Sequence, residues 1–271
     1  VSFGCIIDKL KVGEFMKANY HTHTVRCRHA VGDEHEYIEN AIAAGMKILG
    51  FSDHTPQFFK SGYVSGMRMT PDEAPEYVSC IKSLAEEYNG KIKLYTGFEA
   101  EYFPSLFPEL KRFCTEHNVD YMIMGQHFLE NEDGGYYVGS GSSDRKMLKK
   151  YVDEVIEGIN TGCFSYIAHP DVFLCLSDDD WYYTENERLC EAAKALGVPL
   201  EINMLGLMGK RHYPSERFFK IAAKVGNDII IGCDAHSPDM LLNTEMQKNA
   251  YDFAAALGLK PLEELNLKQI R

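Results

Sequence analysis

The chain has 271 residues, of which 45% are hydrophobic and 25% charged, a composition typical of folded globular proteins rather than disordered or fibrous ones. The 40 acidic and 28 basic residues give a formal net charge of −12, which disfavours long polyanions and anionic membranes as partners. The eight cysteines are scattered without a C-x-x-C pair, and the chain shows neither a transmembrane run nor a signal-peptide pattern. We therefore expect a cytoplasmic protein with reduced thiols.

Short β-rich runs alternate with amphipathic stretches from about residue 18 onwards, as in a parallel sheet covered by helices. The seven predicted strands cover residues 18–21, 48–52, 92–98, 121–125, 164–168, 199–203 and 228–232. The predicted helices cover residues 33–44, 70–88, 105–117, 144–160, 185–196, 215–225 and 239–257. For the second helix, Thr70-Pro71-Asp72-Glu73 predicts a capping-box start.

These strand and helix units follow one another without a linker rich in proline, glycine or serine, which favours one domain over residues 18–271. Residues 1–17 are expected to be an N-terminal extension of unclear role. A (β/α) barrel is the favoured fold, and a doubly wound open sheet is the alternative. Long loops at 53–70, 126–143 and 204–214 each follow a strand, at the end where barrel enzymes carry their active sites.

Seven of the ten histidines lie at the C-terminal end of a predicted strand or in the loop that follows. They are His21, His23, His29, His54, His127, His169 and His236. The third strand ends with Glu99 in the same position. Because residues i and i+2 of a strand face the same side, His21 and His23 can bind one ion, and imidazoles with carboxylates suit Zn²⁺, Mn²⁺ or Fe²⁺. The pattern predicts a metal site at the C-terminal ends of the strands.

Six short segments together resemble the motifs of the polymerase-and-histidinol-phosphatase (PHP) family, in the order and spacing of its histidinol-phosphate phosphatase branch. The segments are His21-Thr22-His23-Thr24 with His29, Ser52-Asp53-His54, Gly97-Phe98-Glu99-Ala100-Glu101-Tyr102, Met124-Gly125-Gln126-His127, Ala168-His169-Pro170-Asp171 and Cys233-Asp234-Ala235-His236-Ser237. The resemblance covers residues 18–257, nearly the whole chain. It implies a distorted (β/α)7 TIM-like barrel with a trinuclear metal centre.

The resemblance also implies nine metal-ligand positions, all of which carry the required residue type here. The implied ligands are His21, His23, Glu99 and Asp234 for the first ion, Glu99, His127 and His169 for the second, and His29, His54 and His236 for the third. The three ions would be zinc, manganese or iron. An amidohydrolase barrel, which also begins with His-x-His, requires a bridging lysine on strand four, where this chain has His127.

The activity implied by the resemblance is that of a metal-dependent phosphomonoesterase that hydrolyses L-histidinol phosphate in histidine biosynthesis. We expect a metal-bound hydroxide to attack phosphorus in line, without a covalent phosphoenzyme. The candidates for catalytic residues that handle the leaving-group proton are Asp234, His236 and Asp53. Sequence alone does not rank them, because a carboxylate such as Asp53 can equally orient a ligand imidazole.

Phosphate oxygens that the metals leave free require a cationic partner. Arg211, in the loop after the sixth strand, is the best candidate because a guanidinium can bind phosphate through two bonds. Arg68 and Lys210 are weaker candidates. The expected partner is a small phosphorylated substrate, with no nucleic acid or membrane, and the oligomeric state is left open.

The alternative function is a PHP-type phosphoesterase that acts on nucleotides or nucleic-acid ends. The net charge of −12 and the lack of a basic stretch with interleaved aromatic residues count against it. A noncatalytic metal-binding barrel is a third possibility, but such a protein would be expected to have lost metal ligands, and no ligand position is empty here.

Overall fold

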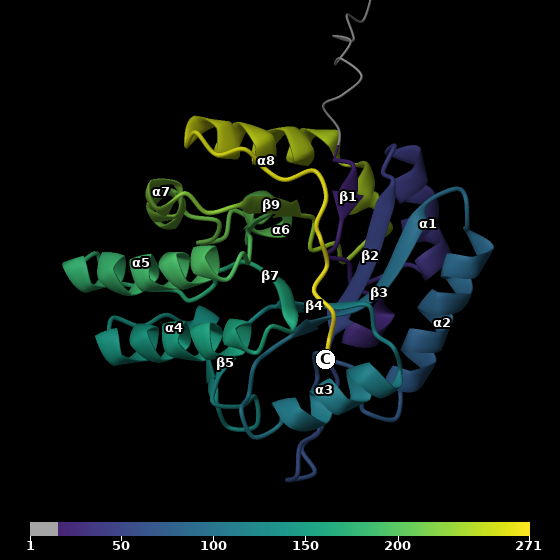
Figure 1. Cartoon of the computed structure of the whole chain (residues 1–271), viewed down its shortest axis with the longest axis horizontal. Helices are drawn as coiled ribbons and strands as arrows, with labels where there is room; N and C mark the ends of the chain where they lie inside the picture. Colours follow the sequence, from purple (N-terminus) through teal and green to yellow (C-terminus); the bar gives the residue numbers. More distant parts are fainter. Residues whose placement is uncertain (1–15) are drawn as a thin grey trace, which may run out of the picture.

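The computed structural model describes residues 16–271, and its central feature is a parallel sheet of seven strands that curves into a nearly closed barrel (Figure 1). The strands follow one another in chain order: β1 (Ala18–Asn19), β2 (Ile48–His54), β3 (Lys93–Ala100), β4 (Tyr121–Met124), β7 (Phe164–Ile167), β8 (Leu200–Asn203) and β9 (Ile229–Gly232). Every predicted strand is present, and the fold is the predicted distorted (β/α)7 barrel.

Hydrogen bonds between the two ends of the sheet close the barrel near the C-terminal ends of its strands. The N–H of His23 donates to the carbonyl oxygen of Ala235 at 2.9 Å, and the N–H of Ala235 donates to that of His21 at 3.2 Å. Thr22 and Ala235 form an isolated parallel bridge. The segments after the first and last strands are therefore held side by side, which excludes the open-sheet alternative.

Helices surround the barrel, with α1 and α2 on the right of Figure 1 and α4, α5 and α7 on the left. Their bounds are α1 (Glu34–Ala43), α2 (Ala74–Glu87), α3 (Phe107–Glu116), α4 (Arg145–Asn160), α5 (Asp180–Ala195), α6 (Met204–Met208), α7 (Glu216–Val225) and α8 (Thr244–Ala256). Short 3₁₀ turns occupy Val25–Cys27, Val138–Ser140 and Pro238–Leu242, and a hairpin of β5 (Phe128–Leu129) and β6 (Tyr136–Tyr137) lies in one of the long predicted loops.

The start of α2 differs from the capping box that the sequence predicts. Helix α2 begins at Ala74, four residues after Thr70, with a proline in its first turn. The N–H and hydroxyl groups of Thr70 both donate to the Glu73 carboxylate, at 2.7 and 3.0 Å. Thr70 and Glu73 therefore close a turn before the helix instead of capping the helix itself.

Two further helices differ from their predicted bounds. Helix α5 begins at Asp180, five residues before the predicted start, because tertiary packing overrides the weak helix propensity of its aromatic first turns. In that stretch Tyr182 is buried, and the guanidinium of Arg217 lies 3.9 Å from the centre of its ring. The predicted helix 239–257 is divided at Asn243, whose side chain accepts a bond from the N–H of Met246 and begins α8.

The interior of the barrel is packed around the buried ring of Tyr121. The hydroxyl of Tyr121 donates to the carbonyl oxygen of Tyr20 at 2.7 Å, on the opposite side of the barrel. A Cβ atom at Gly50 or at Gly97 would lie only 2.3 Å from an atom of the Tyr121 side chain. These two glycines in β2 and β3 leave the space that the ring occupies. The Tyr121 ring and its apolar neighbours thus fill the barrel below the C-terminal ends of the strands.

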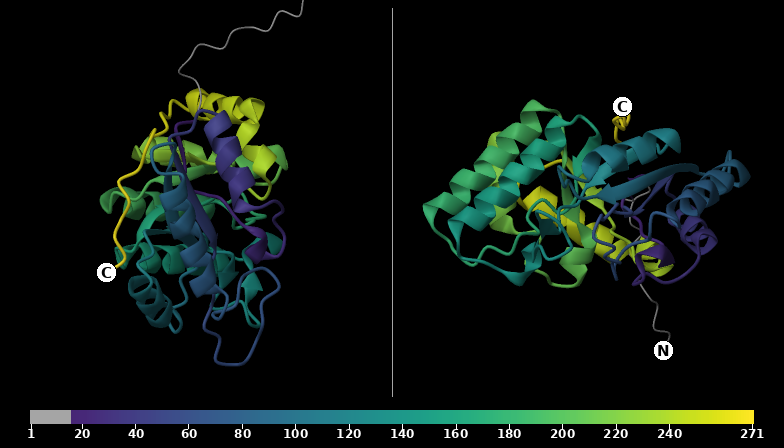
Figure 2. Two further views of the ribbon diagram at one scale, coloured as in Figure 1. Left: turned by 90° about the vertical axis from the view of Figure 1, so that its right-hand side faces the viewer. Right: turned by 90° about the horizontal axis from the view of Figure 1, so that it is seen from below.

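The C-terminal segment after α8, drawn in yellow, runs across the strands in Figure 1 and down one side of the molecule in the left view of Figure 2. The N–H of Leu262 donates to the carbonyl oxygen of Ile229 at 2.7 Å, and the N–H of Leu265 to the hydroxyl of Tyr20 at 3.1 Å. Leu265 and Leu267 pack against the apolar cluster inside the barrel. The segment thus covers the end of the barrel opposite the metal-ligand candidates.

Residues 1–15, within the predicted N-terminal extension, lie outside the described part of the chain. Met16 is already buried in the main core. All seven cysteines in residues 16–271 are free thiols. No helix in the same range combines the length and hydrophobicity that crossing a bilayer would require.

Removal of the Leu265 side chain tests whether the C-terminal segment supports the barrel. We expect Leu265→Ala to lower the free energy of unfolding by about 1–2 kcal/mol, because it uncovers part of the inner apolar cluster. Urea denaturation measures the change. The matched control is Leu262→Ala, because Leu262 is 36% exposed and its replacement is expected to cost less than about 0.5 kcal/mol. Equal effects of the two substitutions would contradict the interpretation.

Candidate metal centre

The carboxylate of Glu99, at the C-terminal end of β3, lies at the centre of the candidate site. Its Oε1 atom is 2.7 Å from Nε2 of His169 and 3.6 Å from Nε2 of His127. The side chain is only 1% exposed. A Cβ atom at Gly125 would lie 2.0 Å from Oε1, so glycine at the end of β4 is required for the carboxylate to fit.

The second oxygen of Glu99 faces three other histidines. Oε2 is 3.0 Å from Nδ1 of His54. It lies 3.6 Å from Nε2 of His21 and 3.5 Å from Nε2 of His23. Oδ1 of Asp234 lies opposite, 3.5 and 3.2 Å from the same two nitrogens. The four side chains predicted to bind the first ion therefore point their donor atoms toward one position.

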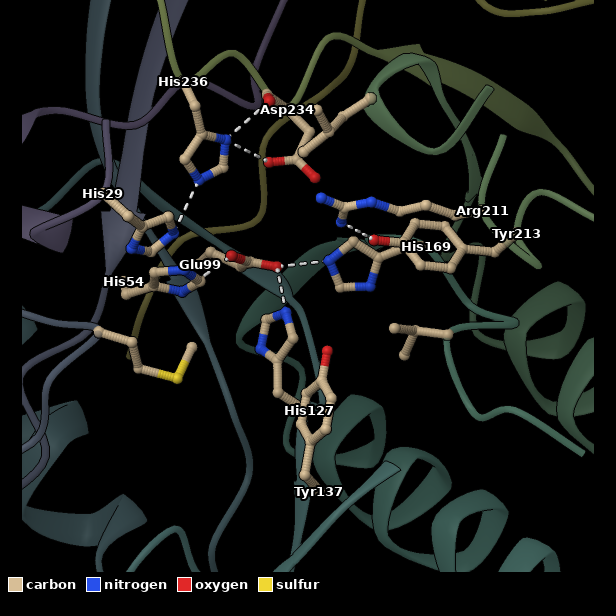
Figure 3. A pocket seen from close by; sticks show the side chains of 13 residues that line it. His29, His54, Glu99, His127, Tyr137, His169, Arg211, Tyr213, Asp234 and His236 are labelled. Carbon is tan, nitrogen blue, oxygen red and sulfur yellow. Dashed lines mark hydrogen bonds and ion pairs between the residues drawn. The ribbon is translucent and has the colours of Figure 1, made fainter. Parts of the chain in front are cut away.

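The three histidines predicted to bind a third ion also lie together, nearer the solvent. The donor atoms of His29, His54 and His236 lie within 4.8 Å of one another. Nε2 of His29 is 3.0 Å from Nε2 of His236, and Figure 3 shows this pair beside Glu99 at the cavity. The nine predicted ligands thus form one cluster, although they come from segments more than 200 residues apart in the sequence.

Two of these residues have backbone angles that L residues rarely adopt. His169 has φ of 28° and Asp234 has φ of 51°, in the left-handed region that costs a non-glycine residue free energy. Each lies two residues after the end of a strand, His169 after β7 and Asp234 after β9. The angles turn the chain sharply where each strand ends, and both side chains line the cavity.

The cluster has the chemistry of a cation site. Nε2 of His21 and Oε2 of Glu99 are buried and have no hydrogen-bond partner among the described residues, which is unusual for buried polar atoms unless a ligand satisfies them. Burial by itself lowers the pKa of His21, but the surrounding carboxylates, first Glu201 and then Asp234, raise it to about 10. The same carboxylates favour a positive charge placed among them, including that of a divalent metal ion.

A cavity of about 470 Å³ opens beside this cluster. It is lined by His29, His54, Met67, Glu99, His127, Tyr137, His169, Val172, Leu205, Arg211, Tyr213, Asp234 and His236. Nη1 of Arg211 donates to the hydroxyl of Tyr213 at 2.6 Å, and the Tyr213 ring lies 5.6 Å from that of His169 (Figure 3). Arg211 is thus held beside the histidines, with its guanidinium facing the cavity.

The other two candidates for phosphate binding do not line the cavity. Lys210 is exposed. Arg68 is 1% exposed and lies between two carboxylates, with Nη2 at 2.7 Å from Glu101 and Nε at 2.7 Å from Glu132. Although burial raises the pKa of the Glu101 carboxyl, the Arg68 guanidinium and His127 together hold it below its ordinary range. The structure therefore corrects the expectation for Arg68, whose guanidinium is already paired and has no access to a ligand.

Of the three candidates for catalytic residues, two line the cavity and one does not. Asp234 and His236 both line the cavity, with Oδ1 and Nδ1 3.3 Å apart. Asp53 is completely buried behind His23, with its Oδ1 atom 3.5 Å from Nδ1 of that ring. Its other oxygen accepts bonds from the N–H and hydroxyl groups of Thr24. Asp53 is thus placed to orient His23 and has no contact with the cavity.

Two buried polar residues near the cluster are absent from the sequence-based prediction. Glu201 and Asn203 lie on β8 and are both completely buried. Polar residues at i and i+2 in an otherwise apolar strand face the same side. The alternation is visible in the sequence as Pro199-Leu200-Glu201-Ile202-Asn203, although neither polar residue is a histidine.

Two relatives with sequence similarity carry the name histidinol-phosphatase. A probable histidinol-phosphatase of Deinococcus radiodurans is 28% identical over 228 residues, which cover 80% of this chain and 85% of the relative. A histidinol-phosphatase of Lactococcus lactis subsp. lactis is 25% identical over 236 residues, covering 81% and 84% of the two chains.

The fold also resembles that of solved structures. A crystal structure of histidinol phosphate phosphatase from Lactococcus lactis, in complex with zinc, L-histidinol and phosphate, matches with a TM-score of 0.71 and 19% identity, covering 93% of this chain and 99% of that one. A putative histidinol phosphatase from Listeria monocytogenes matches with a TM-score of 0.66 and 18% identity, covering 83% and 97%. A sequence profile of the PHP domain matches residues 19–205, more than half of the chain. The barrel, its cluster of histidines and carboxylates, and this match together place the chain in the PHP family.

Proposed function

We propose that this PHP-family protein is a metal-dependent phosphatase that hydrolyses L-histidinol phosphate to L-histidinol and phosphate. The observation that carries the proposal is the convergence of histidines and carboxylates around Glu99 at the floor of a small cavity, with Arg211 on its wall. A cluster of cation sites beside one guanidinium suits a compact phosphate monoester, whose charge both can neutralise.

The choice of substrate is supported by the relatives. Similar proteins from Deinococcus radiodurans and Lactococcus lactis are named as histidinol-phosphatases, and the Lactococcus structure contains zinc, L-histidinol and phosphate. The cavity of about 470 Å³ is of the size that small-molecule sites have in proteins. An ester of an amino alcohol fits this description better than a nucleic-acid end.

We further propose three divalent ions, zinc, manganese or iron, held by the clusters that surround Glu99. The proposed ligands are His21, His23, Glu99 and Asp234 for the first ion, Glu99, His127 and His169 for the second, and His29, His54 and His236 for the third. Such ions, when bound, lower the pKa of water and neutralise charge on phosphoryl oxygens. Glu99 would contribute to two of these ion sites, since its two oxygens face different histidines.

The residues of the cavity wall have distinct proposed tasks. Arg211 binds phosphate oxygens through its guanidinium, which the Tyr213 hydroxyl holds in place at 2.6 Å. The pair Asp234 and His236 lines the cavity. Because both are proposed metal ligands, they are proposed to relay a proton from water to the leaving alkoxide, not to supply one of their own. Asp53 is proposed to orient His23, because it has no access to substrate.

A comparison of substrates tests the proposal. We expect kcat/KM for L-histidinol phosphate to exceed that for p-nitrophenyl phosphate and a nucleoside monophosphate by about 100-fold or more, because the cavity walls select the organic group. A short oligonucleotide is expected to be hydrolysed least, since the acidic surface repels polyanions. Steady-state release of phosphate, with zinc or manganese added, provides the measurement.

Two outcomes of this comparison would contradict the proposal. Equal kcat/KM values for L-histidinol phosphate and the aryl phosphate would reject the substrate while leaving phosphatase chemistry intact. A preference for the oligonucleotide would favour the alternative of a nucleic-acid phosphoesterase. Chelation of the metals serves as the control for mechanism: it should abolish every activity in the panel, and added zinc or manganese should restore it.

Arg211 and Arg68 are expected to respond in opposite ways to substitution. Arg211→Met should lower kcat/KM by about 10- to 100-fold, since one charge-assisted hydrogen bond contributes about 1.5–3 kcal/mol, with little change in stability. Arg68→Met should lower the free energy of unfolding by about 3–5 kcal/mol, because Glu101 and Glu132 would be left buried without their cation. Phosphatase kinetics and urea denaturation separate the two effects.

The matched control is Arg112→Met, because the side chain of Arg112 is 66% exposed and its replacement should leave both measurements unchanged. A loss of kcat/KM in an Arg68→Met protein of unchanged stability would indicate that Arg68 binds phosphate after all. An unchanged kcat/KM in Arg211→Met would show that Arg211 does not bind phosphate.

A further inference from the structure

Strand β8 differs from the other strands of the barrel in supplying none of the proposed metal ligands, yet it carries two buried polar side chains. Glu201 and Asn203 are each 0% exposed. They alternate with Leu200 and Ile202, which belong to the main apolar core. By the alternation of a strand, the two polar side chains therefore face the barrel interior, where an unpaired carboxylate would cost several kcal/mol.

The carboxylate of Glu201 contacts two of the proposed ligands. Its Oε1 atom is 2.8 Å from Nδ1 of His21 and also accepts a bond from the hydroxyl of Tyr166 at 3.3 Å. Its Oε2 atom accepts bonds from the backbone N–H of His169 and from Nδ2 of Asn203, both at 2.9 Å. All four contacts come from groups that can donate a hydrogen bond, so each carboxylate oxygen has two donors.

Asn203 extends this contact to a third proposed ligand. Its Nδ2 group also lies 3.1 Å from Oδ2 of Asp234. Space for the arrangement depends on Gly232 in the neighbouring strand β9, where a Cβ atom would lie 1.8 Å from Oε1 of Glu201. Strand β9 thus leaves a gap at the point where the Glu201 carboxylate passes toward His21.

The contact between Glu201 and His21 determines which nitrogen of the ring can bind a cation. When Nδ1 carries the hydrogen and donates it to Glu201, the lone pair of a neutral imidazole is on Nε2. Nε2 of His21 is the buried atom without a hydrogen-bond partner among the described residues, and it faces Glu99 and Asp234 at 3.6 and 3.5 Å. The carboxylate thus selects the tautomer that the metal site requires.

The contact with His169 acts on the backbone instead. His169 has φ of 28°, an angle that L residues rarely adopt, and its N–H donates to Glu201 at 2.9 Å. A strained backbone persists only where surrounding contacts hold it. The same strained turn places Nε2 of His169 at 2.7 Å from Glu99.

We propose that Glu201 is a positioning residue of the metal centre: it fixes the tautomer and orientation of His21 and the backbone turn at His169, while Asn203 couples it to Asp234. Glu201 touches neither the cavity nor the proposed substrate, so it acts through the ligands. The inference rests on the proposed metal site and makes no assumption about which phosphate ester is the substrate.

The test is the affinity of the full chain for Zn²⁺, measured by competition with a chelating dye after the metals have been removed. Glu201→Gln keeps the size of the side chain but replaces one acceptor oxygen by an NH₂ group, which cannot accept hydrogen bonds from the neighbouring donors. We therefore expect the affinity for the zinc ion that His21 binds to fall about 10- to 100-fold. At limiting zinc, kcat should fall while KM for the phosphate ester stays the same, and excess zinc should restore kcat. In the zinc-loaded chain, the ¹⁵N NMR signal of Nδ1 of His21 should shift, because that nitrogen loses its carboxylate acceptor.

Glu185→Gln is the matched control, since Glu185 is also buried, at 2% exposed, but pairs with Arg145 and Arg188 in place of any proposed ligand. Its zinc affinity should equal that of the parent. If Glu201→Gln does not fold, Glu201→Asp keeps the charge but is one methylene too short to hold both His21 and His169, and zinc affinity should again fall.

A Glu201 variant that folds and binds zinc as tightly as the parent would overturn the positioning role, as would a parent chain that binds no zinc. A parent that binds zinc but does not hydrolyse L-histidinol phosphate would reject the proposed function alone. In that case a weaker zinc affinity of Glu201→Gln would still support the positioning role.

Discussion

The site depends on one buried carboxylate that is surrounded by imidazoles. Glu99 is 1% exposed, and burial alone would favour its neutral form, yet the facing imidazoles, foremost His127 and His54, hold the pKa of its carboxyl well below its ordinary range. A charge in this position is stable only if cations or protonated rings stay around it. The requirement explains why Gly125 has no side chain and why histidines from the ends of four strands, β1, β2, β4 and β7, face Glu99.

The barrel meets this requirement because parallel strands all end on the same face. Hydrogen bonds of His23 and His21 with Ala235 join the first and last strands at that face, so the ligand candidates form a ring instead of a row. The opposite end is closed by the Tyr121 ring and by Leu265 of the C-terminal segment. A rigid apolar floor below and a closed ring above are what allow metal ligands to be held in place before any ion binds.

The sequence predicts the architecture well, because the strands and helices are visible as local periodic patterns of apolar residues. All seven strands are recovered, and the histidines at their ends converge, since strand direction alone brings them to one face. The role of Arg68 is not recoverable in this way, because its burial depends on Glu132, 64 residues further along the chain. Glu201 also escapes prediction, since a carboxylate in a strand reveals its task only when the ring of His21, 180 residues earlier, is seen beside it.

The distribution of charge explains how an acidic protein can bind an anionic substrate. The formal charge of −12 includes buried carboxylates of the candidate metal site, such as Glu99, Glu201 and Asp234. Divalent ions would add all of their positive charge beside these carboxylates, at one mouth of the barrel. Among residues 16–271, Arg211 is the only lysine or arginine that lines the cavity, so attraction for phosphate is confined to a space of about 470 Å³. A compact monoester can enter that space, while a longer polyanion must also lie against the acidic surface around it, which repels it.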